Sequence, residues 1–213
     1  AEINKAALAT NNLLTNLLQW TLAKKNGFSF NPKTESLKDV VTDGISSSLS
    51  LVKIKELKLT VNVDEKINVF IDSYSISSVV RNLLTNAIKF SNLRGEIIFD
   101  ASVANNFVKL SLKDTGLGMD AATVDTLFNE NNHSTTKGTN NEKGTGIGIS
   151  LVKRFVQMNG GTIKVESKLG VGSTFTFSMP LGKKSSNDKN QVVDLPNKNK
   201  KPVSTEKIRK IAI

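Results

Sequence analysis

The most informative stretch of the sequence is Arg81-Asn-Leu-Leu-Thr-Asn-Ala-Ile-Lys-Phe-Ser91, inside the clearest helical pattern of the chain, residues 75–90. Apolar side chains recur there at helical spacing and predict one buried face, made of Ile76, Val79, Val80, Leu83, Leu84, Ala87 and Ile88. Asn82, Asn86 and Lys89 are spaced by four and three residues, so they share a strip on the opposite side. That strip is either an ordinary solvated face or one directed at a ligand, because amide oxygens can ligate Mg²⁺ and lysine can contact phosphate.

A glycine-rich motif, Asp114-Thr-Gly-Leu-Gly-Met119, directly follows a predicted strand. Its glycines let the backbone approach a planar ligand closely. The aspartate can accept a hydrogen bond from an exocyclic amine, which adenine offers and guanine does not. The alternative interpretation is a glycine-rich turn capped by the aspartate.

Two further glycine motifs follow. The polar segment 129–143 predicts a mobile loop, and Gly144-Thr-Gly-Ile-Gly148 then opens a predicted helix over 146–159. Free amides at a helix start can bind phosphate, although the motif could equally be a flexible hinge. Gly170-Val-Gly-Ser-Thr-Phe-Thr-Phe177 predicts a hairpin turn that enters a core strand.

The other predicted elements alternate between helices and short strands. They are a helix at 35–56 weakened by Gly44 and Ser46–Ser48, strands at 57–63 and 68–71, a hairpin of 96–103 with 107–114, a short helix at 120–128, and a final hairpin of 162–167 with 173–179. This order predicts an α+β fold with a largely antiparallel sheet.

The two ends of the chain differ from the middle. Residues 3–25 predict an amphipathic helix, ended by Gly27, whose apolar stripe requires a partner helix or a second chain. Residues 183–213 are basic and poor in apolar side chains, which is typical of a solvated linker. The net charge of +10 comes mostly from this tail, so it does not indicate nucleic-acid binding.

The composition excludes other classes of site. Without cysteine the chain can form neither disulfides nor thiolate metal sites. No apolar run reaches the roughly 18 residues of a membrane helix, and no signal peptide is evident.

Taken in order, these motifs resemble the GHKL ATPase superfamily and, within it, the histidine kinases, over about residues 6–181. Residues 81–91 resemble that family's N box, 114–119 its G1 box, Phe128 its F box, 144–148 its G2 box and 172–175 its closing motif. Leu17-Leu-Gln-Trp20 resembles the end of the dimerisation domain's second helix.

The resemblance implies a two-layer α/β sandwich of the GHKL (Bergerat) type, with a mixed, mostly antiparallel sheet preceded by a long helix. It implies three regions: a partial dimerisation helix and junction at 1–29, an ATP-binding catalytic domain at 30–182, and a basic linker at 183–213.

The resemblance also implies roles for individual residues. Asp114 would hold the adenine amino group with Gly116 and Gly118 lining the base, and Thr174 would support Asp114. Phe90 would pack near the nucleoside, and Phe128 of the F box would be a further ATP-binding residue. Asn86 would ligate Mg²⁺ beside Asn82, Lys89 would contact phosphates, and Lys137, in a predicted ATP lid, would reach the γ-phosphate. The phosphates would be wrapped by Gly144, Thr145, Gly146, Ile147 and Gly148. Asn82, Asn86 and Lys89 are the expected catalytic residues.

The implied function is transfer of the ATP γ-phosphate to a histidine, for relay to a response-regulator aspartate. We expect the acceptor on a dimerisation domain absent from this chain, because the only histidine, His133, lies in the predicted lid. Hydrolysing members of the superfamily carry a glutamate at the position of Asn82, and an amide cannot act as general base, so slow hydrolysis is expected.

Partners and location follow from the same resemblance. We expect a homodimeric parent protein and a receiver domain as phosphate acceptor, and we expect no nucleic-acid partner. The segment is expected to be bacterial and cytoplasmic, without membrane contact of its own, although its parent could be anchored in the inner membrane. Three alternatives stay open: a hydrolysing GHKL machine, an anti-sigma serine kinase, and a module that binds nucleotide or a partner without catalysis.

Overall fold

The computed structural model describes residues 29–129, 138–140, 142 and 146–183. Their centre is a five-stranded sheet in the order β2-β4-β5-β7-β6. The strands are β2 (Lys58–Asn62), β4 (Glu96–Ala104), β5 (Phe107–Asp114), β6 (Ile163–Lys168) and β7 (Gly172–Pro180). β2 runs parallel to β4 and every other neighbouring pair in this sheet is antiparallel. The predicted α+β fold with a mixed, mostly antiparallel sheet is confirmed.

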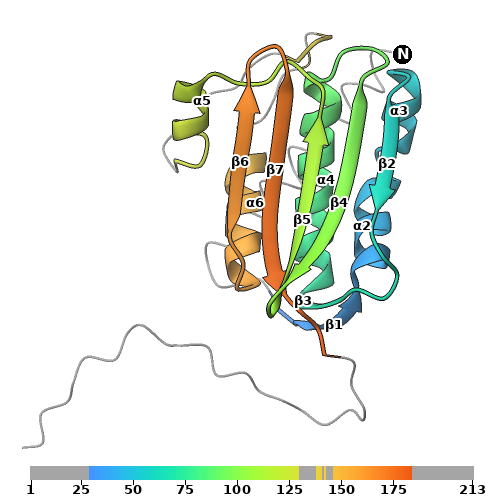
Figure 1. The fold of residues 1–213 in the computed structure, drawn as a ribbon, viewed down its shortest axis with the longest axis vertical. Coiled ribbons are helices and arrows are strands. Elements are labelled where there is room, and N and C mark those ends of the chain that lie inside the picture. The colour runs from blue at the N-terminus through green and yellow to red at the C-terminus, as the bar shows by residue number, and fades with distance from the viewer. Residues whose placement is uncertain (1–28, 130–137, 141, 143–145, 184–213) are drawn as a thin grey trace, which may run out of the picture.

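Three helices cover one face of this sheet, as Figure 1 shows: α2 (Leu37–Ser46), α4 (Ser73–Phe90) and α6 (Gly148–Met158). The strands alternate accordingly, so that on β5 the buried Leu110, Leu112 and Asp114 point toward the helices. Two shorter helices, α3 (Leu49–Ile54) and α5 (Ala121–Thr126), complete the described helical structure. The arrangement is a two-layer sandwich with one open sheet face.

α4 lies between α2 and α6 and contacts both of them. Asp72 caps its start by accepting a hydrogen bond from the Ser75 backbone N–H at 2.8 Å, and Ser91 follows its last residue. All seven apolar residues predicted for its inner face are buried. The apolar face of α4 is therefore the central part of the core.

The predicted single helix at 35–56 is wrong. Its first two residues belong to β1 (Lys33–Ser36), which pairs antiparallel with β3 (Asn68–Ile71) in a separate two-stranded sheet. Ser36 then caps α2, and the helix stops at Ser46 before α3 begins at Leu49. The hydroxyl of Ser46 donates to the Asp43 carbonyl at 2.7 Å, the local competition with helix hydrogen bonds that makes serine a poor helix former.

Gly44 is required inside α2 and is not a weakness of the helix. A Cβ atom at this position would lie 2.7 Å from Cβ of Val80 on α4 and 2.9 Å from the Ser77 carbonyl oxygen. Real Cβ atoms do not approach other atoms that closely, so glycine permits the close contact between α2 and α4.

Several predictions concern segments outside the described residues. These are the helix at 3–25 with Trp20, the region 1–29 apart from its last residue, most of the loop at 129–143 including His133, and the tail beyond Lys183. Within the described part of the chain, no helix has both the length and the apolar character that crossing a bilayer requires.

The packing at Gly44 predicts the sign of a mutation. Alanine is the better helix former by about 1 kcal/mol, so helix propensity alone would make Gly44→Ala stabilising. We expect the overpacked contact with Val80 to outweigh this gain and to lower the free energy of unfolding by about 1–2 kcal/mol. Urea unfolding measures the difference, with the exposed neighbour Asp43→Ala as control. A stabilised Gly44→Ala protein would contradict the close contact.

Candidate functional site

The predicted strip on α4 is partly exposed, as expected. The side-chain amide of Asn82 donates to the Ser78 carbonyl at 2.8 Å, one turn back along the helix. Its oxygen lies against Gly148 at the start of α6, where a Cβ atom would be only 3.0 Å away. The side-chain amide of Asn86, one turn further on, has no hydrogen-bond partner among the described residues. The amide oxygen of Asn82 thus lies beside the glycine that begins α6, and Asn86 shares its strip of the helix one turn further on.

Lys89 and Phe90 form the end of this strip. The Lys89 ammonium lies 4.6 Å from the centre of the Phe90 ring, within range of a cation–π interaction. Partial burial lowers the pKa of Lys89 below its usual value, although the negative charge of Glu142 opposes that shift. The Phe90 carbonyl accepts a hydrogen bond from Leu117 N–H at 3.0 Å, which ties the end of α4 to the segment after β5.

Asp114 ends β5 and is only 5% exposed. Its Oδ1 atom accepts hydrogen bonds from the backbone N–H groups of Gly116 at 2.8 Å and Ser173 at 3.3 Å. Burial raises the pKa of Asp114, and these two hydrogen bonds to the charged form oppose the shift. Oδ2 has no hydrogen-bond partner among the described residues, and it keeps some exposure to solvent. One carboxylate oxygen is therefore available to a ligand.

The glycines after Asp114 allow close backbone contacts. A Cβ atom at Gly116 would lie 2.6 Å from the Phe90 carbonyl oxygen. Gly118 has a φ of +65°, and a Cβ atom there would lie 2.0 Å from the Lys168 carbonyl oxygen. Any larger residue would push this segment away from α4 and from the turn between β6 and β7.

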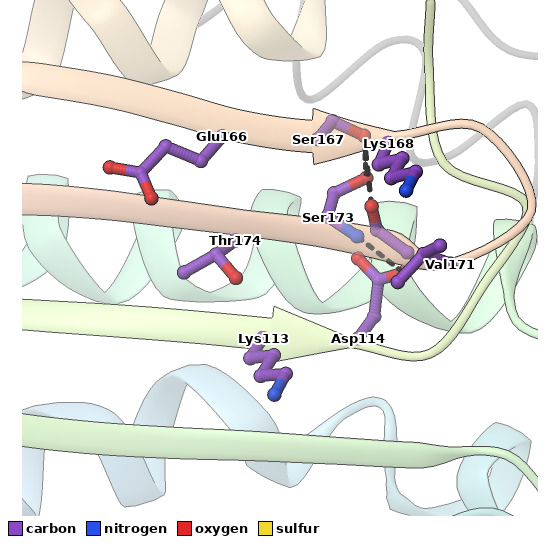
Figure 2. A pocket seen from close by; sticks show the side chains of 9 residues that line it. Lys113, Asp114, Glu166, Ser167, Lys168, Val171, Ser173 and Thr174 are labelled. Carbon is purple, nitrogen blue, oxygen red and sulfur yellow. Dashed lines mark hydrogen bonds between the residues drawn. The ribbon is translucent and has the colours of Figure 1, made fainter.

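A hollow of about 270 Å³ adjoins Asp114, and its lining includes Lys113, Glu166 and Thr174, which lie on the open face of the sheet. Figure 2 shows it at the end of β5 and at the turn between β6 and β7, where Asp114, Ser167 and Ser173 are joined by hydrogen bonds. It does not extend to the α4 strip, so the described residues show two neighbouring parts of a site: a carboxylate end and an amide-lysine strip. The hydrogen bond from Leu117 to Phe90 joins the two parts.

Thr174 does not lie where its predicted role requires. Asp114 is paired across the sheet with Ser173, and both side chains point toward the helices, whereas Thr174 is paired with Lys113 on the open face. Sequence reasoning chose the wrong member of the Ser173-Thr174 pair, because a shift of one residue in register exchanges the two faces. Ser173 is the residue that the structure brings to Asp114.

The structure describes some of the remaining predicted residues and not others. Gly146 has a φ of +72° and Ile147 occupies the N-cap position of α6 without a side-chain capping hydrogen bond, so the helix begins at Gly148, two residues later than predicted. Phe128 packs against the core, and its carbonyl accepts a hydrogen bond from Lys153 at 3.1 Å. Lys137, Gly144 and Thr145 lie outside the described residues. The described residues contain no cluster of three or more His, Cys, Asp or Glu side chains that could hold a metal without a ligand's help.

Sequence reasoning missed Lys55 and Glu142. They form an ion pair of 3.0 Å beside the end of α4, and the Lys55 side chain is 7% exposed. Lys55 follows an amphipathic helix, where a lysine normally lies in solvent, and Glu142 lies in a polar segment. No spacing in the sequence indicates that the two residues meet.

Comparisons with known proteins agree with this geometry. A model of the family described as histidine kinase-, DNA gyrase B-, and HSP90-like ATPase matches residues 71–183. Hybrid signal transduction histidine kinase B of Dictyostelium discoideum is 33% identical over 135 residues, covering 60% of this chain and 7% of that protein. Sensor histidine kinase RcsC of Salmonella typhimurium is 29% identical over 171 residues, covering 79% of this chain and 18% of RcsC.

The fold has a close counterpart among solved structures. Full-length ShkA in complex with AMPPNP aligns with a TM-score of 0.68 at 20% identity, covering 82% of this chain and 36% of ShkA. The chain belongs to the family of histidine kinase-, DNA gyrase B- and HSP90-like ATPases. Within that family its relatives place it with the catalytic domains of sensor histidine kinases, and it spans less than a fifth of the length of the two curated relatives described above.

The buried carboxylate predicts an unusual stability effect. In Asp114→Asn, the amide oxygen can accept the same two backbone hydrogen bonds without a buried charge. We therefore expect the free energy of unfolding near pH 7 to match or exceed that of wild type, by up to about 1 kcal/mol.

The pH dependence of this effect has a definite sign. Because the folded-state pKa of Asp114 is raised, its ionisation removes stability as the pH rises from the usual aspartate range through the raised value. The advantage of Asp114→Asn should grow over that interval, which urea unfolding between about pH 4 and about pH 7 would measure. A variant markedly less stable than wild type at neutral pH would contradict this account.

Proposed function

We propose that the chain binds ATP together with Mg²⁺ and transfers the γ-phosphate to a histidine on a separate dimerisation domain. The observation that carries the proposal is buried Asp114, whose Oδ2 has no hydrogen-bond partner among the described residues and whose segment is joined through Leu117 and Phe90 to the strip on α4. The ATPase family, and the AMPPNP bound to ShkA, support a nucleotide as the ligand.

Asp114 would recognise the adenine base. Its Oδ1 is already used by two backbone amides, so Oδ2 is left to accept a hydrogen bond from the exocyclic amine. Guanine would present a carbonyl oxygen to the same atom, leaving a desolvated carboxylate without a donor. Ser173 would position Asp114 through its backbone N–H, and Gly116 and Gly118 would leave room for the flat face of the base.

The strip on α4 would bind the triphosphate. The Lys89 ammonium lies at its end, and the amide oxygens of Asn82 and Asn86 are hard ligands of the kind Mg²⁺ prefers. Because the described residues offer no carboxylate cluster, the metal would be held by Asn86 together with phosphate oxygens and water. Mg²⁺ would supply neutralisation of phosphate charge. Gly146, Ile147 and Gly148 would present backbone amides to the phosphates at the start of α6.

The same strip disfavours hydrolysis. The amide of Asn82 cannot accept a proton from water, and its nitrogen is held by the Ser78 carbonyl. An incoming imidazole nitrogen needs no such base: it attacks the γ-phosphorus in line while the bond to the ADP oxygen breaks. The site therefore suits transfer to a histidine better than transfer to water.

The partners are inferred from the relatives. We propose that residues 1–29 are part of a dimerisation domain in a homodimeric parent protein, and that another part of this domain carries the acceptor histidine. A receiver-domain aspartate would accept the phosphate next. One relative is named as a hybrid kinase, which supports relay of this kind. The basic residues 183–213 would form a linker, and no role in binding nucleic acid is proposed for them.

A phosphotransfer assay tests the proposal. The chain is mixed with a dimerisation domain of a sensor histidine kinase and γ-labelled ATP or GTP, and acid-labile, base-stable label on the acceptor is measured. We expect transfer from ATP with Mg²⁺, at least about 100-fold less from GTP, and loss of transfer in Asp114→Asn, in line with discrimination by a buried polar group. Chelation of Mg²⁺ should abolish it.

The controls separate the alternatives. Thr176→Ala, on the open sheet face and outside the lining of the hollow, should keep wild-type transfer. Label released as phosphate faster than it reaches the acceptor would indicate a hydrolysing ATPase instead. ATP binding without any transfer to the histidine domain would indicate a module that binds nucleotide without catalysis.

A further inference from the structure

Lys55 is a buried cation that the proposed reaction does not use. It follows α3, and its ammonium donates to the carbonyl oxygens of Ile88 at 2.7 Å, Lys89 at 3.2 Å and Ser91 at 3.4 Å. These carbonyls lie at the end of α4, where helix hydrogen bonding leaves oxygens without partners and the helix dipole is negative. Lys55 therefore stabilises the end of the helix that carries Lys89.

The same ammonium reaches a segment far along the chain. It donates to the Thr139 hydroxyl at 2.8 Å and pairs with Glu142 at 3.0 Å. Glu142 also closes its own turn, since it accepts hydrogen bonds from Asn140 N–H at 2.8 Å and, through its carbonyl, from Gly138 N–H at 2.9 Å. One buried charge thus connects the end of α4 with residues 138–140 and Glu142.

This connection brings the segment directly against Lys89. Thr139 N–H donates to the Lys89 carbonyl at 3.1 Å, and a Cβ atom at Gly138 would lie 2.5 Å from Cγ of Lys89. The charge of Glu142 acts on the Lys89 ammonium. In the sequence, Glu142 precedes the first residue of α6 by six positions.

An ordinary packing role does not account for a lysine at this position. A buried ammonium loses several kcal/mol of hydration, and an apolar side chain of similar size often replaces a buried ion pair without loss of stability. The ammonium is instead surrounded by acceptors from two segments. The Thr139 hydroxyl also joins these segments, since it lies 3.2 Å from the Lys89 carbonyl oxygen and 2.9 Å from that of Ser91, but Lys55 is the charged group between them.

We propose that Lys55 is a positioning residue for the ATP site: it holds the end of α4 together with residues 138–140 and Glu142, so that Lys89 is directed at the phosphates. The inference rests on the proposed ATP binding. Lys55 itself touches no substrate in this account. Its loss should affect recognition of the phosphates and leave recognition of the base at Asp114 unchanged.

Calorimetric titrations with ATP and adenosine test this. We expect Lys55→Met to weaken ATP binding about tenfold or more, the scale of one lost charge-assisted hydrogen bond, and adenosine binding less than about twofold. Lys55→Arg should recover most of the ATP affinity, because a guanidinium can also meet carbonyls and a carboxylate. Lys58→Met is the matched control, since Lys58 pairs with Glu96 on the exposed surface.

Hydrogen exchange of the nucleotide-free chain tests the anchoring separately. In Lys55→Met the amides of Gly138 and Thr139 should exchange faster, while that of Gly116 stays at the wild-type rate. Glu142→Gln removes the ion pair but leaves Lys55 on the α4 carbonyls, so it provides a second variant should Lys55→Met fold poorly. We expect it to accelerate exchange at Gly138 and to weaken ATP binding more than adenosine binding.

Two results would overturn the inference. One is wild-type ATP affinity and exchange rates in both variants. The other is an equal loss of ATP and adenosine binding in proportion to lost stability, which would show a structural role alone. If the wild-type chain bound no nucleotide, the proposed function would fail, and the exchange rates would still decide whether Lys55 anchors residues 138–140 and Glu142.

Discussion

The burial of one face of α4 is the constraint on which the site depends. Its apolar side chains pack against the sheet and between α2 and α6, and Gly44 lets α2 approach closely enough to complete that packing. A helix fixed on its apolar face has no rotational freedom left, so the core sets the direction of the strip of Asn82, Asn86 and Lys89. The placement of these polar side chains therefore depends on the packing of the opposite face of the helix.

Two buried charges set the properties of the site at either end. Two backbone amides donate hydrogen bonds to one oxygen of Asp114, and the other oxygen has no partner among the described residues. This second oxygen can accept a hydrogen bond from a ligand. Lys55 is compensated completely, by carbonyls of α4 and by Glu142. The difference follows from hydration. A buried charge that lacks a partner in the fold gains a favourable interaction when a ligand supplies one, whereas a fully hydrogen-bonded charge fixes the positions of the groups around it. Asp114 is in this way suited to recognition and Lys55 to positioning.

Much of this structure follows from sequence because the relevant signals are local. The period of α4 and the hairpin of β4 and β5 each depend on neighbouring residues, and those predictions agree with the structure. The failures have non-local causes. Strand β1 exists because residues 33–36 pair with β3, over thirty residues away. The choice of Ser173 over Thr174 depends on register with β5. The Lys55–Glu142 pair joins side chains 87 positions apart, and no pattern of spacing could have indicated it.

The central claim is that one free oxygen of Asp114 reads the adenine base while the α4 strip binds the phosphates. A crystal structure of the chain with a non-hydrolysable ATP analogue and Mg²⁺ tests it most directly. The account predicts the adenine amino nitrogen within about 3 Å of Asp114 Oδ2, a normal hydrogen-bond distance, with the triphosphate extending toward Asn86 and Lys89. A base bound away from Asp114, or phosphates directed away from α4, would contradict the account even if the affinity for ATP were high.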